Sequence, residues 1–250
     1  MPSVNIKGVL IGEGLPKICV PLTDTNTESL RKSLSEMKQH EFDLIEWRAD
    51  KFAGLFNKEA LIEASELIRS EFPDTPLIFT IRTRLDMDNF EISDLYYKDI
   101  NLFVSDYGLA DLIDIEYSHG DSFFRDITND IHKNGVKVIA SKHVASSTPE
   151  VPEIVDLLIK MQDAGADIVK FASMPCSERD VLKLIDATLT MKEKHNDTPV
   201  ITMSMGRMGV ISRICGSLTG SALTFGTIGA ASAPGQFSSD ELKRMLETIG

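Results

Sequence analysis

Cysteine is scarce in this sequence, and so are the segments that direct a chain to a membrane. The three cysteines, Cys19, Cys176 and Cys215, are odd in number and widely spaced, so neither a disulfide framework nor a CxxC zinc site is indicated. A reducing cytoplasm is therefore the expected location. No apolar run approaches the roughly 18 residues of a membrane span. Residues 1–14 lack the basic and apolar regions of a secretory signal, so we expect no membrane association.

Basic residues are also fewer than acidic residues. The formal net charge of −12 argues against nucleic acid as a partner, because a binder needs a basic patch that displaces counterions. No cluster of His, Cys and carboxylate residues has metal-ligand spacing, so no metal site is predicted. A small anionic substrate remains compatible with the sequence, since its binding depends on local rather than net charge.

What the sequence does contain is a regular alternation of short apolar runs with longer amphipathic segments. A length of 250 residues is typical of a single (β/α)8 barrel. Most of the runs are continuously hydrophobic, as expected for parallel strands that are covered on both faces. The predicted strands are residues 17–22, 42–48, 77–82, 112–117, 137–143, 168–172, 200–205 and 222–227.

The segments between these runs show helical periodicity with recognisable starts and stops. The predicted helices that are most clearly bounded are residues 28–41, 57–72, 150–164, 177–195 and 239–249. Eight β-then-α units predict a closed (β/α)8 barrel rather than an open doubly wound sheet. Residues 4–11, with Gly8, predict a short β-hairpin that closes the N-terminal end of the barrel. No linker divides the chain, so residues 1–250 are expected to form one catalytic domain.

Lys170 is the most informative residue, because lysine is rarely buried without a partner and a central parallel strand is a poor place for it. An arbitrary lysine at a strand end more often extends its amine into solvent. Here, burial beside several arginines disfavours the charged ammonium. A neutral amine is the nucleophile that attacks a carbonyl to form an imine. We therefore interpret Lys170 as a Schiff-base lysine.

His143 ends the strand before that of Lys170 and is suited to proton transfer, because an unperturbed histidine titrates at about 6.5. A single histidine is more often structural, and we expect His119, His132, His195 and His40 to lie at the surface.

Three arginines also fall at or beyond strand ends, namely Arg48, Arg82 and Arg213. Strand alternation places Glu46 on the same face as Arg48, and the alternative interpretation is a set of ion pairs inside the barrel. Three arginines and a lysine exceed what one glutamate balances. A bound carboxylate that is gripped by a guanidinium would remove this imbalance.

Seven segments, in order along the chain, resemble the type I 3-dehydroquinate dehydratase family. They are Glu46-Trp47-Arg48, Thr80-Ile81-Arg82, Lys142-His143, Val169-Lys170, residues 201–206, residues 209–213 and residues 231–236. The resemblance runs from about residue 17 to residue 236. It implies conversion of 3-dehydroquinate to 3-dehydroshikimate and water, a step of the shikimate pathway, with no metal or organic cofactor.

The resemblance also implies roles for individual residues. Lys170 forms the imine, His143 transfers protons, and Arg213 holds the substrate carboxylate. Glu46, Arg48 and Arg82 order the hydroxyls and balance charge, while Ser232 and Gln236 belong to a loop that closes over the occupied site. Asp86 stands where the family has an acidic residue that supports the histidine, and Asp88 is close by. The resemblance also implies a homodimeric assembly.

Two rival functions fit parts of the same pattern. Another Schiff-base barrel enzyme, such as a class I aldolase, would use the same lysine to cleave a carbon–carbon bond. A catalytically silent barrel could bind a carboxylate ligand, but the joint presence of Lys170, His143 and Arg213 argues against it.

Overall fold

The computed structural model describes residues 2–229 and 235–250. Its central sheet has eight parallel strands in the order β10-β3-β4-β5-β6-β7-β8-β9. The strands are β3 (Lys17–Leu22), β4 (Leu44–Arg48), β5 (Leu77–Thr80), β6 (Leu112–Glu116), β7 (Lys137–Val144), β8 (Ile168–Ser173), β9 (Val200–Ser204) and β10 (Leu223–Phe225). A parallel bridge between Val200 and Ser221 joins β9 to the segment before β10 and closes the sheet into a barrel.

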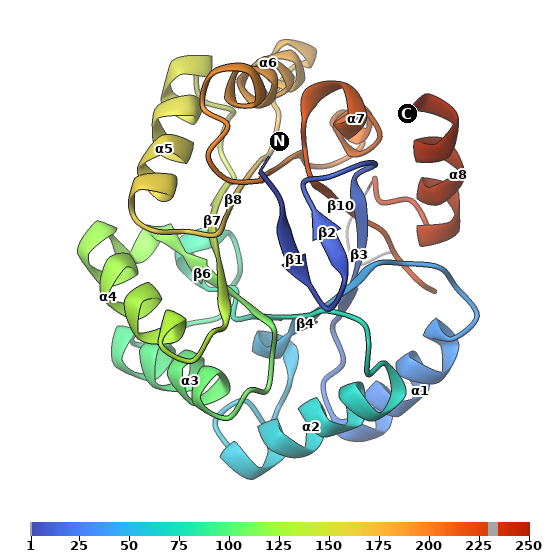
Figure 1. Cartoon of the computed structure of the whole chain (residues 1–250), viewed down its shortest axis with the longest axis vertical. Coiled ribbons are helices and arrows are strands. Elements are labelled where there is room, and N and C mark those ends of the chain that lie inside the picture. Colours follow the sequence, from blue (N-terminus) through green and yellow to red (C-terminus); the bar gives the residue numbers. More distant parts are fainter. Residues whose placement is uncertain (1, 230–234) are drawn as a thin grey trace.

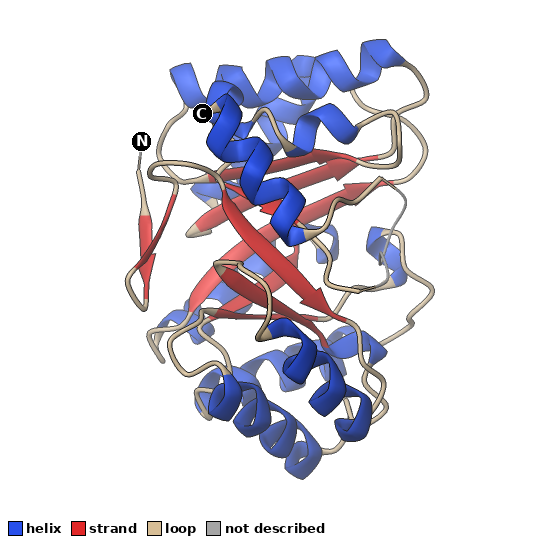
Figure 2. Cartoon of the chain, turned by 90° about the vertical axis from the view of Figure 1, so that its right-hand side faces the viewer, coloured by secondary structure: helices blue, strands red, loops and turns tan. Residues whose placement is uncertain are grey.

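Helices surround the strands, as Figure 1 and Figure 2 show. They are α1 (Thr27–Met37), α2 (Lys58–Glu71), α3 (Asp94–Asp106), α4 (Asp121–His132), α5 (Val151–Asp163), α6 (Glu178–Lys194), α7 (Gly216–Thr219) and α8 (Ser239–Ile249). Short 3-10 turns lie beyond four strands: η1 (Ala49–Lys51), η2 (Arg84–Asp86), η3 (Tyr117–His119) and η4 (Val210–Arg213). The predicted (β/α)8 barrel is confirmed.

Polar side chains cap the starts of α1 and α8. Asn26 caps α1 and Ser238 caps α8, each through a reciprocal hydrogen-bond pair with the third residue of the helix. Such pairs satisfy backbone amides that have no partner in the first turn. The predicted helix at residues 239–249 is confirmed, and the one predicted at residues 28–41 is shorter, at Thr27–Met37.

The predicted N-terminal hairpin is also confirmed. β1 (Val4–Ile6) and β2 (Val9–Ile11) pair antiparallel, and Figure 1 shows them lying across the middle of the barrel in that view. Ile6 and Ile11 are buried in one apolar cluster with inward residues from the N-terminal halves of the barrel strands, including Leu44 and Ile168. The hairpin therefore seals the N-terminal end with apolar side chains.

The barrel interior is layered because alternate residues of a strand point to the same side. Next to the hairpin is an apolar layer of Leu44, Ile78, Leu112, Ile139 and Ile168. Two residues further along the same strands is a polar layer of Glu46, Thr80, Asp114, Ser141 and Lys170, whose side chains hydrogen-bond across the barrel. The next step along the strands reaches the mouth. The apolar floor therefore supports a buried polar layer that opens only toward the C-terminal end.

Candidate active site

A cavity of about 680 Å³ occupies the C-terminal mouth of the barrel. It is lined by every predicted site residue that the structure describes, namely Glu46, Arg48, Arg82, Asp86, His143, Lys170, Arg213 and Gln236. Ser232 lies outside the described residues. Active sites of this fold lie at this end, where loops from several strands meet.

Lys170 lies at the bottom of this cavity and is 3% exposed. Its Nζ donates to Asp114 Oδ2 at 3.0 Å and to Glu46 Oε1 at 3.3 Å. The same nitrogen lies 4.7 Å from the centre of the Phe225 ring. The predicted burial is confirmed, but the direct partners of the amine are carboxylates rather than arginines. These contacts hold Nζ at one position below the cavity.

Arg82 is the most heavily paired cation of the site. Its guanidinium donates to Asp114 Oδ2 at 2.9 Å, to Glu116 Oε1 at 3.1 Å and to Ser141 Oγ at 2.8 Å. Burial lowers the pKa of Arg82, but the neighbouring carboxylates outweigh burial and raise the pKa above its ordinary value. Burial also acts on Asp114, yet the charges of Arg82 and Lys170 hold the pKa of that carboxyl well below its usual range.

These pairs correct one prediction. The argument that three arginines and a lysine exceed the available negative charge is wrong, because β6 contributes Asp114 and Glu116 to the barrel interior. The general excess of positive charge therefore does not exist, and the case for a bound carboxylate depends on individual arginines.

Arg213 is the arginine for which that case holds. It lies at the end of η4 and is 4% exposed. Among the residues that the structure describes, Nε and Nη1 of Arg213 find no hydrogen-bond partner. Burial lowers the pKa of Arg213, and no carboxylate in the described ranges, 2–229 and 235–250, opposes this shift. A buried guanidinium without a partner is energetically unfavourable, and an incoming carboxylate would supply the missing acceptors.

Asp86 contacts His143 by two routes. Asp86 Oδ2 accepts the backbone N–H of His143 at 2.7 Å and lies 3.0 Å from the ring Nδ1. Since an ionised carboxylate only accepts, the ring carries its proton on Nδ1 in the neutral form and leaves Nε2 as the base. Burial and the charge of Arg82 lower the pKa of His143 to about 4, while the hydrogen bond to Asp86 opposes this shift. The imidazole is therefore neutral at neutral pH.

Asp88 has different partners, which decides between the two acidic residues. Asp88 Oδ2 accepts from Arg48 Nη2 at 2.8 Å and from Lys51 Nζ at 2.8 Å. Arg48 also donates to both oxygens of Asp50, at 2.8 and 2.9 Å. Asp88 thus orders the cations on the β4 side of the mouth, whereas Asp86 serves the histidine.

The loop after β10 returns to the cavity at Gln236. Gly235 precedes it with a φ of +79°, and an added Cβ would lie 2.5 Å from the carbonyl oxygen of Gly206. Glycine is the residue that tolerates this backbone angle and this close approach.

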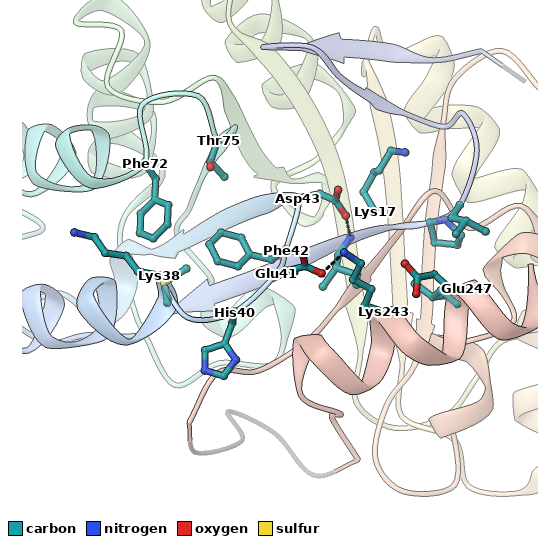
Figure 3. Close-up of a pocket in the computed structure, with 15 residues that line it drawn as sticks. Lys17, Lys38, His40, Glu41, Phe42, Asp43, Phe72, Thr75, Lys243 and Glu247 are labelled. Carbon is teal, nitrogen blue, oxygen red and sulfur yellow. Dashed lines mark hydrogen bonds and ion pairs between the residues drawn. The ribbon is translucent and has the colours of Figure 1, made fainter.

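A second cavity, of about 630 Å³, lies beside the N-terminal ends of β3 and β4. Figure 3 shows that its lining side chains come from β3, from the loop before β4, from the segment after α2 and from α8. Phe42 and Phe72 form an aromatic pair in its wall, with ring centres 5.5 Å apart. Several of its charged groups are engaged in pairs, among them Lys243 with Glu41 and His40 with Asp240.

Comparison with known proteins identifies the family. Residues 18–250 match the family model described as type I 3-dehydroquinase. The chain belongs to the type I 3-dehydroquinase family. It is 45% identical over 247 residues to a 3-dehydroquinate dehydratase of Clostridioides difficile, covering 99% of this chain and 97% of that protein.

Solved structures of this family agree with the assignment. A type I 3-dehydroquinate dehydratase from Clostridium difficile, crystallised with covalently modified comenic acid, superposes with a TM-score of 0.96 at 45% identity. That match covers 99% of this chain and 98% of the other. The 3-dehydroquinate dehydratase of Enterococcus faecalis gives a TM-score of 0.91 at 33% identity and covers 98% and 99% of the two chains.

The sequence patterns did not predict two acidic residues of the site in this member of the type I 3-dehydroquinase family. Asp114 and Glu116 alternate with isoleucine in β6, and two acidic residues on one side of a buried parallel strand were a signal for the barrel interior. The prediction that His119 lies at the surface is wrong, because its side chain is 1% exposed. Its ring packs on Tyr97 at 4.3 Å, a contact that strand and helix periodicity does not reveal.

Proposed function

We propose that this chain dehydrates 3-dehydroquinate to 3-dehydroshikimate through a Schiff base on Lys170. The observation that carries the proposal is the presence, in one cavity, of a buried amine, a neutral imidazole and a guanidinium whose Nε and Nη1 have no hydrogen-bond partner among the described residues. Relatives across the whole length of the chain are named for this reaction.

Arg213 takes the substrate carboxylate, because its buried donors have no acceptor among the described residues. This contact places the substrate ketone toward the floor of the cavity, where Lys170 lies. Nζ, once deprotonated, attacks the ketone carbon, and water leaves to give an iminium.

The iminium draws electrons from the neighbouring C–H bond and acidifies it. Nε2 of His143 is the base that accepts this proton, because Nδ1 is engaged by Asp86. The proton then assists the departing hydroxyl, which leaves as water and creates the conjugated double bond. Hydrolysis of the imine restores the Lys170 amine. Every protein group that takes part in these steps is a side chain, so the proposed mechanism involves no metal or organic cofactor.

Arg48, Glu46 and Arg82 complete the proposed site in different ways. Arg48 is half-buried at the mouth and lies where it can reach substrate hydroxyls. Glu46 and Arg82 are 5% exposed and act mainly through their contacts in the polar layer. Gln236 lines the cavity, and Ser232 is proposed to cover the occupied site with it.

The setting of this activity is also proposed. Residues 1–250 act as one domain, because the cavity draws residues from β4 through to the segment after β10. We expect a homodimer in the cytoplasm, where the three free thiols of the chain stay reduced. The net charge of −12 disfavours nucleic acid as a partner. Among the described residues, no helix has both the length and the hydropathy to cross a bilayer.

The direct test is ultraviolet absorbance after the purified protein is mixed with 3-dehydroquinate. The conjugated product absorbs where the substrate does not, so a rising signal supports the proposal. Carbon–carbon cleavage products would instead indicate an aldolase, and an unchanged substrate that still binds would indicate a silent carboxylate-binding barrel.

A further inference from the structure

Two side chains behind the catalytic histidine hold the carboxylate that supports it. Lys142 Nζ donates to Ser118 Oγ at 2.6 Å and to Asp86 Oδ1 at 3.3 Å. Ser118 Oγ donates to the same Oδ1. Neither Lys142 nor Ser118 is among the residues that line the cavity. They therefore contact Asp86 from the side opposite to the substrate.

We propose that Lys142 and Ser118 form a clamp on Asp86 that positions His143 for proton transfer. The inference rests on the proposed function, and it assigns both as positioning residues that act through Asp86. Lys142 directly precedes His143 on β7, and Ser118 lies in η3 beyond β6.

The clamp is needed because the two oxygens of Asp86 have unequal tasks. Oδ2 accepts from the backbone and the ring of His143, and Arg82 Nη1 lies 3.8 Å from this oxygen. A carboxylate turns about its terminal torsion between broad, roughly two-fold minima. Without donors at Oδ1, the group could turn toward Arg82 and weaken its bond to the ring. Donors on the far side hold the orientation in which Oδ2 faces Nδ1.

The clamp also adds a positive charge near the imidazole. The other charged groups around the Asp86–His143 pair are Arg82 beyond β5, Asp114 and Glu116 on β6, and Lys170 on β8. Burial, Arg82 and Lys170 lower the pKa of His143, and Asp86 opposes them. A cation disfavours the imidazolium, so loss of the Lys142 charge raises the pKa of His143.

The test compares Lys142→Met, Lys142→Arg and Ser118→Ala with the parental protein. The matched control is Lys137→Met, because Lys137 lies on the same strand but pairs with Asp167 at 2.8 Å, at the opposite end. Dehydration kinetics give kcat and KM, and nuclear magnetic resonance follows the titration of the His143 ring. The His143 signal is identified among the five histidines by its loss in His143→Gln.

We expect Lys142→Met to lower kcat by roughly tenfold, as for the loss of one hydrogen bond to a charged group. KM should stay within about twofold, because substrate contacts remain, and the titration midpoint of His143 should rise. Lys142→Arg should retain most of kcat and the parental midpoint, since the charge remains. Ser118→Ala should lower kcat while leaving the midpoint closer to the parental value.

A Lys142→Met variant with parental kcat and a parental His143 midpoint overturns the clamp. Equal changes in Lys137→Met would also overturn it, since they would reflect a general effect on β7. If the parental protein forms no product while the midpoint still rises in Lys142→Met, the clamp is supported and the proposed function fails. The two proposals can therefore be separated.

Discussion

The barrel carries two cavities of similar volume at opposite ends, about 680 Å³ at the C-terminal mouth and about 630 Å³ beside the N-terminal ends of β3 and β4. They differ in how their charges are arranged. The C-terminal cavity holds buried charges, and the guanidinium of Arg213 is without a partner among the described residues. Several charged groups of the N-terminal cavity are exposed or partly exposed and are engaged in pairs, such as Lys243 with Glu41 (Figure 3).

The difference shows that volume alone does not mark a functional site. A buried charge without a partner raises the free energy of the empty protein, and a ligand of opposite charge removes this penalty. Exposed ion pairs gain little free energy from a charged ligand, because water already solvates them. A variant at the N-terminal cavity that loses activity would contradict this difference between the two cavities. Variants at the mouth measure how much each buried charge contributes.

The largest expected effect is that of Lys170→Met, which removes the nucleophile and should abolish turnover. Lys243→Met at the N-terminal cavity is the matched control and should retain parental kcat and KM. Measurements of product formation and of circular dichroism separate lost chemistry from lost folding. Substantial turnover by folded Lys170→Met would contradict the covalent mechanism.

His143→Ala should come next, with kcat reduced by about 10²–10⁴-fold, a typical loss for a positioned acid or base. Substrate binding should persist, because Arg213 is intact. Single-turnover kinetics and equilibrium binding of substrate would test this pair of outcomes. A parental rate would assign the proton transfer to another group.

Two arginine variants should differ in their effects on folding stability. Arg213→Met should raise KM strongly without loss of folding stability, because the guanidinium it removes has no ion-pair partner among the described residues. Arg82→Met should destabilise the fold by about 3–5 kcal/mol, since it removes the buried cation that pairs with both Asp114 and Glu116. Urea unfolding and steady-state kinetics measure both effects. An unchanged KM in Arg213→Met would remove this residue from carboxylate binding.

The smallest effect concerns pH. The folded pKa of His143, about 4, lies below the ordinary value of 6.5. Between these values the unfolded chain binds a proton that the folded protein does not, so stability falls as pH decreases from 6.5 to 4. This part of the loss should be smaller in His143→Gln. Unfolding curves across this range would show the difference, and identical slopes for both proteins would contradict the assignment.

The sequence predicted much of the fold because the barrel strands are marked by continuous apolar runs. The strand of Lys17–Leu22 was placed at its observed bounds, and most others differ by one or two residues at an end. The α3 and α4 helices were not delimited in advance. Both helices follow loops without proline, and periodicity alone gives weak boundaries there.

The site was less completely predictable, because ion pairing depends on tertiary contacts. Lys170, His143 and Arg213 were predicted as site residues from their positions within, at the end of or beyond strands and from the family resemblance, and all three line the mouth. The charge balance was misjudged, since Asp114 and Glu116 were read as part of a strand and not as interior side chains. The choice of Asp86 over Asp88 needed the path of the loop after β5, where Met87 has a φ of 76°.

One measurement tests the central claim most directly. The protein is incubated with 3-dehydroquinate and borohydride, digested, and analysed by peptide mass spectrometry. The account predicts that the reduced substrate is attached to the peptide that contains Lys170, and to no other lysine. Product formation with no trapped adduct, or with an adduct at another lysine, would contradict it.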